Sequence, residues 1–149
     1  MRNTSQLSTQ SQTALGNWLN TFDWTHWATL TTKYQLTLKS GRRIATGFHR
    51  ELSRAGDTKI FWAAEPFDLK EGYHLHALIK IPNILNFNNI IQTYQHVSGN
   101  KNLEKGDKWN RIQLENYNPK LGASHYISKY ITKKLCDYDV LFSSNTIKY

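Results

Sequence analysis

Two closely spaced apolar segments constrain most strongly what this chain can fold into. Residues 59–67, KIFWAAEPF, and residues 73–81, YHLHALIKI, are rich in aliphatic and aromatic side chains. That composition is typical of β-strands with at least one buried face. Only residues 68–72 separate the two segments, a connection too short for the crossover that parallel strands require. We therefore expect an antiparallel hairpin whose loop is longer than a tight turn.

The segments around this hairpin show the periodicities of further strands and helices. Apolar residues at helical steps, such as Ile44, Phe48 and Leu52, predict a helix for which Ser40 is a plausible N-cap. Besides the hairpin, strands are expected at Trp27–Lys33 and Trp109–Tyr117, and helices at Ala14–Trp27, Ser40–Ala55, Asn86–Val97 and Gly122–Leu135. Helices that alternate with a small, mostly antiparallel sheet predict an α+β fold.

Length and local composition predict a single domain. The chain has 149 residues, which suits one compact domain. Residues 1–13 are almost entirely polar, so we expect them to form a flexible N-terminal arm and residues 14–149 to form the domain. The tail from Cys136 to Tyr149 carries no clear pattern.

The charge balance suggests a polyanionic partner. The chain has 19 Lys and Arg against 11 Asp and Glu, a net charge of +8. Such an excess is typical of nucleic-acid-binding proteins, although solubility alone would also explain it. The sequence has no apolar run long enough to span a membrane and no apolar signal core at its start. Its single cysteine, Cys136, excludes a disulfide framework. We therefore expect a cytoplasmic protein with no membrane partner.

Two histidines and a glutamate in the hairpin predict a metal site. His74 and His76 are two residues apart in a strand, so both side chains leave the same face, opposite Leu75. Glu65 lies near the end of the preceding strand, beside this pair. A carboxylate in an apolar strand is costly unless it is paired or coordinated, although Glu65 could simply end the strand before Pro66. A ligand set of Glu65, His74 and His76 suits Mg²⁺ or Mn²⁺ with a phosphate substrate, and the imidazoles favour Mn²⁺.

The last expected helix, Gly122–Leu135, combines phenols with ammonium groups on one face. At 100° per residue, Tyr126, Lys129, Tyr130 and Lys133 fall within one arc of about 100°, separate from an apolar stripe. A phenol is a poor nucleophile at neutral pH, but nearby lysines favour the phenolate and can hold a phosphate. The same pattern would also suit an amphipathic surface helix. The interpretation of this face as part of a catalytic site therefore depends on the strand that holds His74 and His76.

These motifs together resemble those of the HUH endonucleases, and more closely the Rep class that initiates rolling-circle replication. Ala28–Thr32 resembles the first, Thr-rich strand motif of the family, and Gly72–Ile79 matches its His-hydrophobic-His motif. Tyr126–Lys129 matches the tyrosine motif Y-x-x-K, which Tyr130–Lys133 repeats at once. Glu65 matches the acidic third ligand found on the neighbouring strand in many Reps. The motifs span residues 28 to 133 in the order of the family.

The resemblance implies a five-stranded antiparallel sheet flanked by helices, similar to that of RNA-recognition domains. It implies a metal-dependent strand transferase in which a tyrosine attacks a phosphodiester of single-stranded DNA, leaving a 5′-phosphotyrosine and a free 3′-OH. Tandem tyrosines are similar to those of initiators from small phages and some plasmids. We expect Tyr126 to attack first because its motif comes first, with Tyr130 acting in turn.

The resemblance also implies partners and DNA contacts. The expected substrate is single-stranded DNA at an origin or nick site, including a hairpin, with no small-molecule substrate. A host helicase and polymerase would complete replication, in the cytoplasm of a prokaryotic host or the nucleus of a eukaryotic one. Lys129 and Lys133 are the expected contacts at the cleavage site, and Arg42 and Arg43 are further candidates for phosphate contacts.

Three other functions compete with this interpretation. A single-domain HUH transposase would have similar motifs, but such enzymes tend to take a polar ligand from the tyrosine helix, where this chain offers lysine. A non-catalytic module could bind single strands through aromatic and basic side chains. A two-histidine, one-carboxylate iron oxygenase would use the same ligands, but it would leave the tyrosine helix without a purpose.

Overall fold

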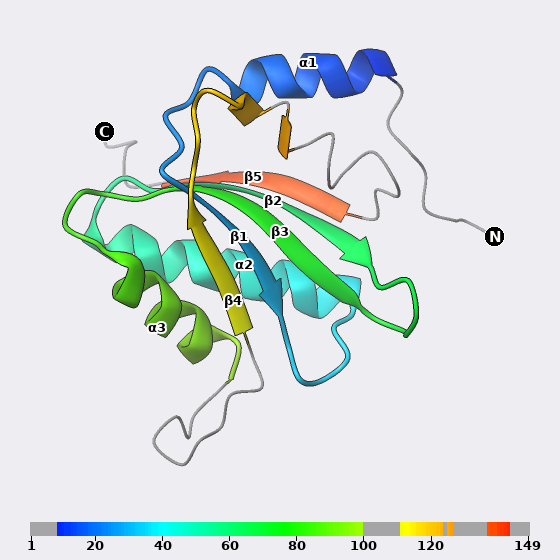
Figure 1. Cartoon of the computed structure of the whole chain (residues 1–149). Helices are drawn as coiled ribbons and strands as arrows, with labels where there is room; N and C mark the ends of the chain where they lie inside the picture. Colours follow the sequence, from blue (N-terminus) through cyan, green and yellow to red (C-terminus); the bar gives the residue numbers. More distant parts are fainter. Residues whose placement is uncertain (1–8, 100–110, 124, 127–136, 144–149) are drawn as a thin grey trace, which may run out of the picture.

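The computed structural model describes residues 9–99, 111–123, 125–126 and 137–143 (Figure 1). In chain order the elements are α1 (Thr9–Leu19), β1 (His26–Thr31), α2 (Leu38–Leu52), a 3₁₀ turn (Ser53–Ala55), β2 (Lys59–Pro66), β3 (Tyr73–Lys80), α3 (Phe87–Val97), β4 (Arg111–Asn116) and β5 (Asp137–Phe142). The strands form one antiparallel sheet in the order β4-β1-β3-β2-β5. The α+β prediction with a five-stranded antiparallel sheet is thus confirmed.

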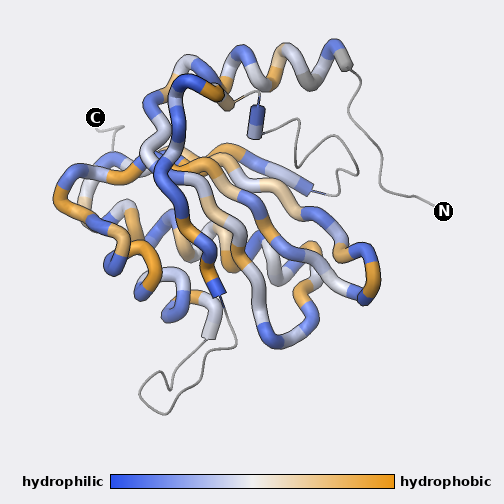
Figure 2. The backbone as a smooth tube through the Cα atoms, viewed as in Figure 1, coloured by the Kyte–Doolittle hydropathy of each residue, from blue (hydrophilic) through white to orange (hydrophobic). Residues whose placement is uncertain are grey.

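The predicted hairpin forms the middle of this sheet. Strands β2 and β3 pair from Lys59 opposite Lys80 to Pro66 opposite Tyr73, and β3 is also paired with β1. Because side chains alternate along a strand, this register gives the hairpin two faces of different character. Hydrophobic positions occur along these central strands (Figure 2).

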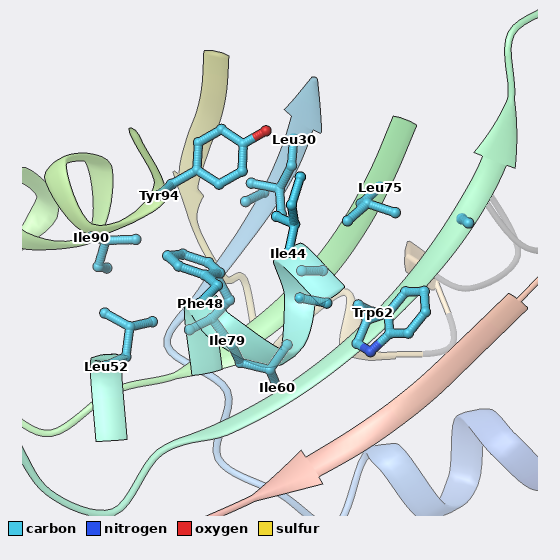
Figure 3. Close-up of a cluster of buried hydrophobic side chains, with 14 of the residues drawn as sticks. Leu30, Ile44, Phe48, Leu52, Ile60, Trp62, Leu75, Ile79, Ile90 and Tyr94 are labelled. Carbon is cyan, nitrogen blue, oxygen red and sulfur yellow. The ribbon is translucent and has the colours of Figure 1, made fainter. Parts of the chain in front are cut away.

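One face of the sheet is covered by α2 and α3 and holds the larger core. Phe48 and Leu52 of α2 and Tyr94 of α3 are about 1% exposed, and they pack with the buried Trp62 and Leu75 of the hairpin (Figure 3). The rings of Phe48 and Tyr94 meet edge to face, with centroids 5.8 Å apart. The helical spacing of apolar residues in α2 therefore has the predicted consequence: that stripe faces the sheet.

The opposite face holds a smaller cluster under α1. Leu19 of α1 and the following Trp24 pack with Phe61 of β2 and Leu78 of β3, and Tyr126 belongs to the same cluster. The indole Nε1 of Trp24 donates to the carbonyl of Leu19 at 2.8 Å. Helix α1 and the segment around Tyr126 therefore lie on the side of the sheet opposite α2 and α3 (Figure 1).

Several predicted boundaries differ from those observed. Helix α1 begins at Thr9, inside the stretch expected to be a flexible arm, and it ends at Leu19, well before Trp27. The N-cap of α2 is Thr37, not Ser40: Thr37 Oγ1 accepts from the Ser40 amide at 3.0 Å, and Ser40 is the third residue of a capping box. Asn86 caps α3 as expected.

The C-terminal part of the chain differs most from expectation. Strand β5 lies in the tail from Cys136 to Tyr149, which carries no clear sequence pattern, and it pairs with β2 at the edge of the sheet. Of the predicted helix Gly122–Leu135, the structure describes helical backbone at Gly122, Ala123, His125 and Tyr126, while residues 124 and 127–135 lie outside the described part. Within the part that is described, no helix is both long and apolar enough to cross a membrane.

The hairpin loop ends at a glycine whose backbone few other residues could adopt. Gly72 has φ of 104°, and a Cβ built there would lie 3.0 Å from Gln35 Cγ. The loop is closed by a hydrogen bond from the Phe67 amide to the Gly72 carbonyl at 3.1 Å. Gly72 therefore permits both the turn into β3 and the close approach of the chain around Gln35.

We predict that Gly72→Ala lowers the free energy of unfolding by about 1–3 kcal/mol, because alanine is strained at positive φ and its Cβ would also crowd Gln35 Cγ. Gly99→Ala is the matched control, since Gly99 has φ of 92° but no described atom within 4 Å of a built Cβ. Urea denaturation should show the larger loss for Gly72→Ala. Equal losses would mean that crowding against Gln35 contributes nothing.

Candidate metal site

The register of the hairpin brings the three predicted ligands together. Glu65 pairs with His74 across β2 and β3, and His76 pairs with Ala63. Glu65 Oε1 lies 3.0 Å from His74 Nε2 and 2.8 Å from His76 Nε2, and the ligand atoms all lie within 4.8 Å of one another. This buried group could hold a metal ion, as the sequence predicts.

The site occupies the sheet face opposite α2. Leu75 and Ala77, which alternate with the two histidines, lie in the core beneath α2, so His74 and His76 face the other side. Their side chains are 16% and 9% exposed, and that of Glu65 is 16% exposed. Three polar groups are thus largely withdrawn from water, an arrangement that is unfavourable unless they satisfy one another or bind a ligand.

Burial keeps both imidazoles neutral at physiological pH. It lowers the pKa of His76 to about 4, although the hydrogen bond to Glu65 acts in the opposite direction. It also lowers the pKa of His74, against the attraction of the Glu65 carboxylate. Neutral imidazole is the charge state that binds metal ions, so neither ring has to lose a net proton before it can act as a ligand.

The hydrogen bonds show which ring nitrogens carry the protons while no ion is bound. A carboxylate can only accept, so the Nε2–H groups of His74 and His76 both donate to Glu65 Oε1. The Nδ1 atom of His74 is buried and has no hydrogen-bond partner among the described residues. That of His76 lies 3.3 Å from Thr29 Oγ1. Two imidazole nitrogens and one carboxylate oxygen already converge, and they could hold a divalent cation once the proton of each ring moves from Nε2 to Nδ1.

Residues that the sequence does not single out complete the surroundings. On the same sheet face, paired positions run in a row from Gln113 through Thr29 and His76 to Ala63 and Tyr138. Thr29 belongs to the Thr-rich strand, so its position beside His76 has a signal in the sequence. No sequence signal indicates the position of Tyr138, because β5 itself is not predicted.

An aromatic ring from the hairpin loop covers one histidine. The ring of Phe67 lies over that of His74, with centroids 4.7 Å apart and planes inclined by 33°. Lys70 Nζ lies 4.4 Å from the centre of the Phe67 ring on the loop. The triad is therefore bounded by the loop at one end, and no sequence signal indicates this contact.

Tyr126, the expected nucleophile, lies on the sheet face of the triad but is buried. It is 8% exposed, and its ring packs against Trp27 and Tyr117 at centroid distances of 5.2 and 5.3 Å. Its hydroxyl oxygen accepts from the amide of Asn118 at 3.2 Å. Trp27 is two residues before Thr29 on β1, so Tyr126 contacts the sheet one side-chain row away from His76. The other expected residues of this helix, Lys129, Tyr130 and Lys133, lie outside the described residues.

The structure does not bring Arg42 and Arg43 to the triad, because α2 covers the other face of the sheet. Arg42 holds β5: its guanidinium pairs with Asp137 at 2.8 Å and Asp139 at 2.9 Å, and it lies 5.1 Å from the ring of Trp62. The hydrogen bond to Asp137 raises the pKa of Arg42 further above its usual value. Arg43 is exposed on the same helix.

Comparison of the chain with protein-family models, with curated proteins and with solved structures found no significant match. The interpretation of the site therefore depends on its own geometry and on the sequence motifs.

We predict that the protein binds one Mn²⁺ at the triad. Isothermal titration calorimetry should give a single site in the wild type. His76→Ala and Glu65→Gln should each weaken binding by at least about tenfold, since even outer-shell changes cost that much. His96→Ala, an exposed histidine on α3, is the control and should bind normally. Equal affinity in all four proteins would place the ion elsewhere.

The metal-free protein should lose stability as the pH falls below about 6.5. Burial lowers the pKa of His26, His49, His74 and His76 from the usual 6.5. The unfolded chain therefore binds more protons than the folded protein below this pH, so the free energy of unfolding decreases as pH falls towards about 4. Urea denaturation in EDTA at several pH values measures this decrease. A urea midpoint that stays constant or increases as the pH falls from about 6.5 to 4 would contradict the lowered pKa values of these histidines.

Proposed function

We propose that this protein is a metal-dependent endonuclease and strand transferase that acts on single-stranded DNA, in the manner of the HUH endonucleases of the Rep class. The observation that carries the proposal is the convergence of Glu65, His74 and His76 on the sheet face that also carries Tyr126. A metal site alone is compatible with many functions. The proposal joins it to the tandem Y-x-x-K motif, which follows β4 in the sequence.

Glu65, His74 and His76 would hold the ion, and the proposed ion is Mn²⁺ or Mg²⁺. Two imidazoles beside one carboxylate favour Mn²⁺ over the harder Mg²⁺. When bound, a divalent ion would polarise the scissile phosphate and orient it for attack. The low exposure of the three side chains supports this role, because electrostatic interactions are stronger where water is excluded.

The proposed chemical step is a transfer between two phosphoesters. The phenol oxygen of a tyrosine attacks the phosphorus and loses its proton, and the bond from phosphorus to the 3′ oxygen breaks. The leaving oxygen takes up a proton and becomes a free 3′-OH, while the phosphate remains on the tyrosine as a 5′-phosphotyrosine. The number of phosphoester bonds is unchanged, so the reverse transfer can join DNA ends. The 3′-OH would prime a polymerase in rolling-circle replication.

The surroundings of Tyr126 bear on which tyrosine attacks first. Its ring is enclosed by Trp27 and Tyr117, and its hydroxyl is engaged by the Asn118 amide. Attack by Tyr126 would require the hydroxyl to leave this amide and reach the phosphate. Tyr130 carries the same motif four positions later in the sequence. Both tyrosines are therefore candidates, and in the proposal Lys129 and Lys133 favour the phenolate and hold the phosphate.

The proposal predicts a covalent adduct that depends on metal and tyrosine. Wild-type protein incubated with end-labelled single-stranded oligonucleotides and Mn²⁺ should give a shifted band that survives denaturing electrophoresis. The band should be absent in EDTA and in the double variant Tyr126→Phe/Tyr130→Phe. Of the single variants, the one that abolishes the first cleavage identifies the leading nucleophile.

One control variant and one contradicting outcome complete the experiment. Tyr34→Phe changes a tyrosine whose hydroxyl donates to the Ser98 carbonyl at 3.0 Å, and it should form the adduct normally. Binding of the cognate origin without any adduct, in either metal, would exclude the endonuclease and favour a non-catalytic binding module.

A further inference from the structure

Helix α2 presents an unusually uniform surface on the side of the molecule remote from the triad. Within Leu38–Leu52, the exposed residues are Lys39, Arg42, Arg43, Thr46 and Arg50. All but Thr46 carry a positive charge. Surface helices ordinarily mix both signs, because like charges at these spacings repel one another.

Arg42 forms ion pairs within the fold, and the other three cations, Lys39, Arg43 and Arg50, lie along one line of the helix. Arg42 pairs with Asp137 and Asp139 of β5. At 100° per residue, Lys39, Arg43 and Arg50 fall within about 40° of one another, with Thr46 beside them. No ion pair joins any of these three cations to a described carboxylate. We call Lys39, Arg43, Thr46 and Arg50 the basic stripe.

The only acidic residue of α2 does not neutralise this stripe. Glu51 lies outside the arc and pairs with Arg54 at 3.1 Å. With α2 rising about 1.5 Å per residue, the stripe spans roughly 16 Å from Lys39 to Arg50. Maintaining three like charges along one helix face reduces its stability, so an anionic partner that neutralises them would stabilise this arrangement.

From these observations we infer that the basic stripe of α2 is a second nucleic-acid surface, which binds the phosphate backbone of duplex DNA. The inference goes beyond the proposed function, because this surface lies on the other layer of the fold and needs neither the metal nor a tyrosine. In that function, it would hold a duplex that flanks the single-stranded substrate.

The composition of the stripe favours DNA over a lipid surface. Helices that bind membranes bury apolar side chains between the headgroups, but Ile44, Phe48 and Leu52 of α2 are in the core. Leu38, at the start of the helix, is partly buried and packs against that core. Regularly spaced cations with a hydroxyl between them match phosphate groups, which fix position rather than sequence. Binding of single strands also requires stacking platforms, and no residue of the stripe is aromatic.

The test compares two variants that lose the same charge. The stripe variant is Lys39→Gln/Arg43→Gln/Arg50→Gln, and the control is Lys70→Gln/Arg111→Gln/Lys120→Gln, which removes three exposed cations elsewhere. Fluorescence anisotropy measures the binding of a labelled duplex in EDTA, so that the triad cannot contribute through a metal. Circular dichroism verifies that both variants are folded.

The stripe variant should bind duplex DNA at least about tenfold more weakly than wild type. The logarithm of its association constant should also depend less steeply on the logarithm of salt concentration. The slope should decrease in magnitude by up to about 2.7, which is about 0.9 for each of three lost phosphate contacts. The control should stay within about threefold. Equal losses in both variants, a larger loss in the control, or no duplex binding by the wild type would overturn the inference. Binding to phosphatidylserine vesicles is measured for the same proteins. If the stripe variant loses vesicle binding while its duplex binding is unchanged, the inference is also overturned.

Failure of this inference can be distinguished from failure of the proposed function. The stripe variant should still form the covalent adduct with a single-stranded oligonucleotide and Mn²⁺. An adduct with unchanged duplex binding in the stripe variant would reject only the duplex surface. Weakened duplex binding with no adduct from the wild type would reject only the endonuclease.

Discussion

The arrangement of the whole molecule depends on the antiparallel register of β2 and β3. Because Glu65 pairs with His74 and side chains alternate along each strand, one carboxylate and two imidazoles must share a sheet face. Their mutual hydrogen bonds, at 2.8 and 3.0 Å, offset the cost of burying three polar groups. A slip of one residue would place them in the apolar core beneath α2.

This register divides the molecule into two sides of different chemical character. On one side, α2 and α3 pack on the sheet and form the larger core, and the outer surface of α2 is basic. On the other side, α1 and Tyr126 pack on the sheet in a smaller cluster, and the triad lies on this same face. Arg42 ties α2 to the edge of the sheet, because its guanidinium pairs with the aspartates of the edge strand β5.

The sequence predicts what local patterns determine and misses what distant contacts decide. His74 and His76 are recognisable because alternation is local, and Glu65 follows from the hairpin. The N-cap of α2 differs because Thr37 and Ser40 form a reciprocal pair, in which either residue could be taken for the cap. Strand β5 escapes prediction because Asp137 and Asp139 face the α2 side and are satisfied by Arg42, about 95 residues earlier. The burial of Tyr126 likewise depends on Trp27, a distant residue.

The central claim is that Glu65, His74 and His76 form a metal centre, and anomalous diffraction from a Mn²⁺-soaked crystal tests it most directly. The account predicts one anomalous peak bonded to Glu65 Oε1 and to Nε2 of both histidines, with the hydrogen bonds between these atoms replaced by bonds to the ion. A triad that keeps those hydrogen bonds and shows no peak at saturating Mn²⁺ would contradict the account.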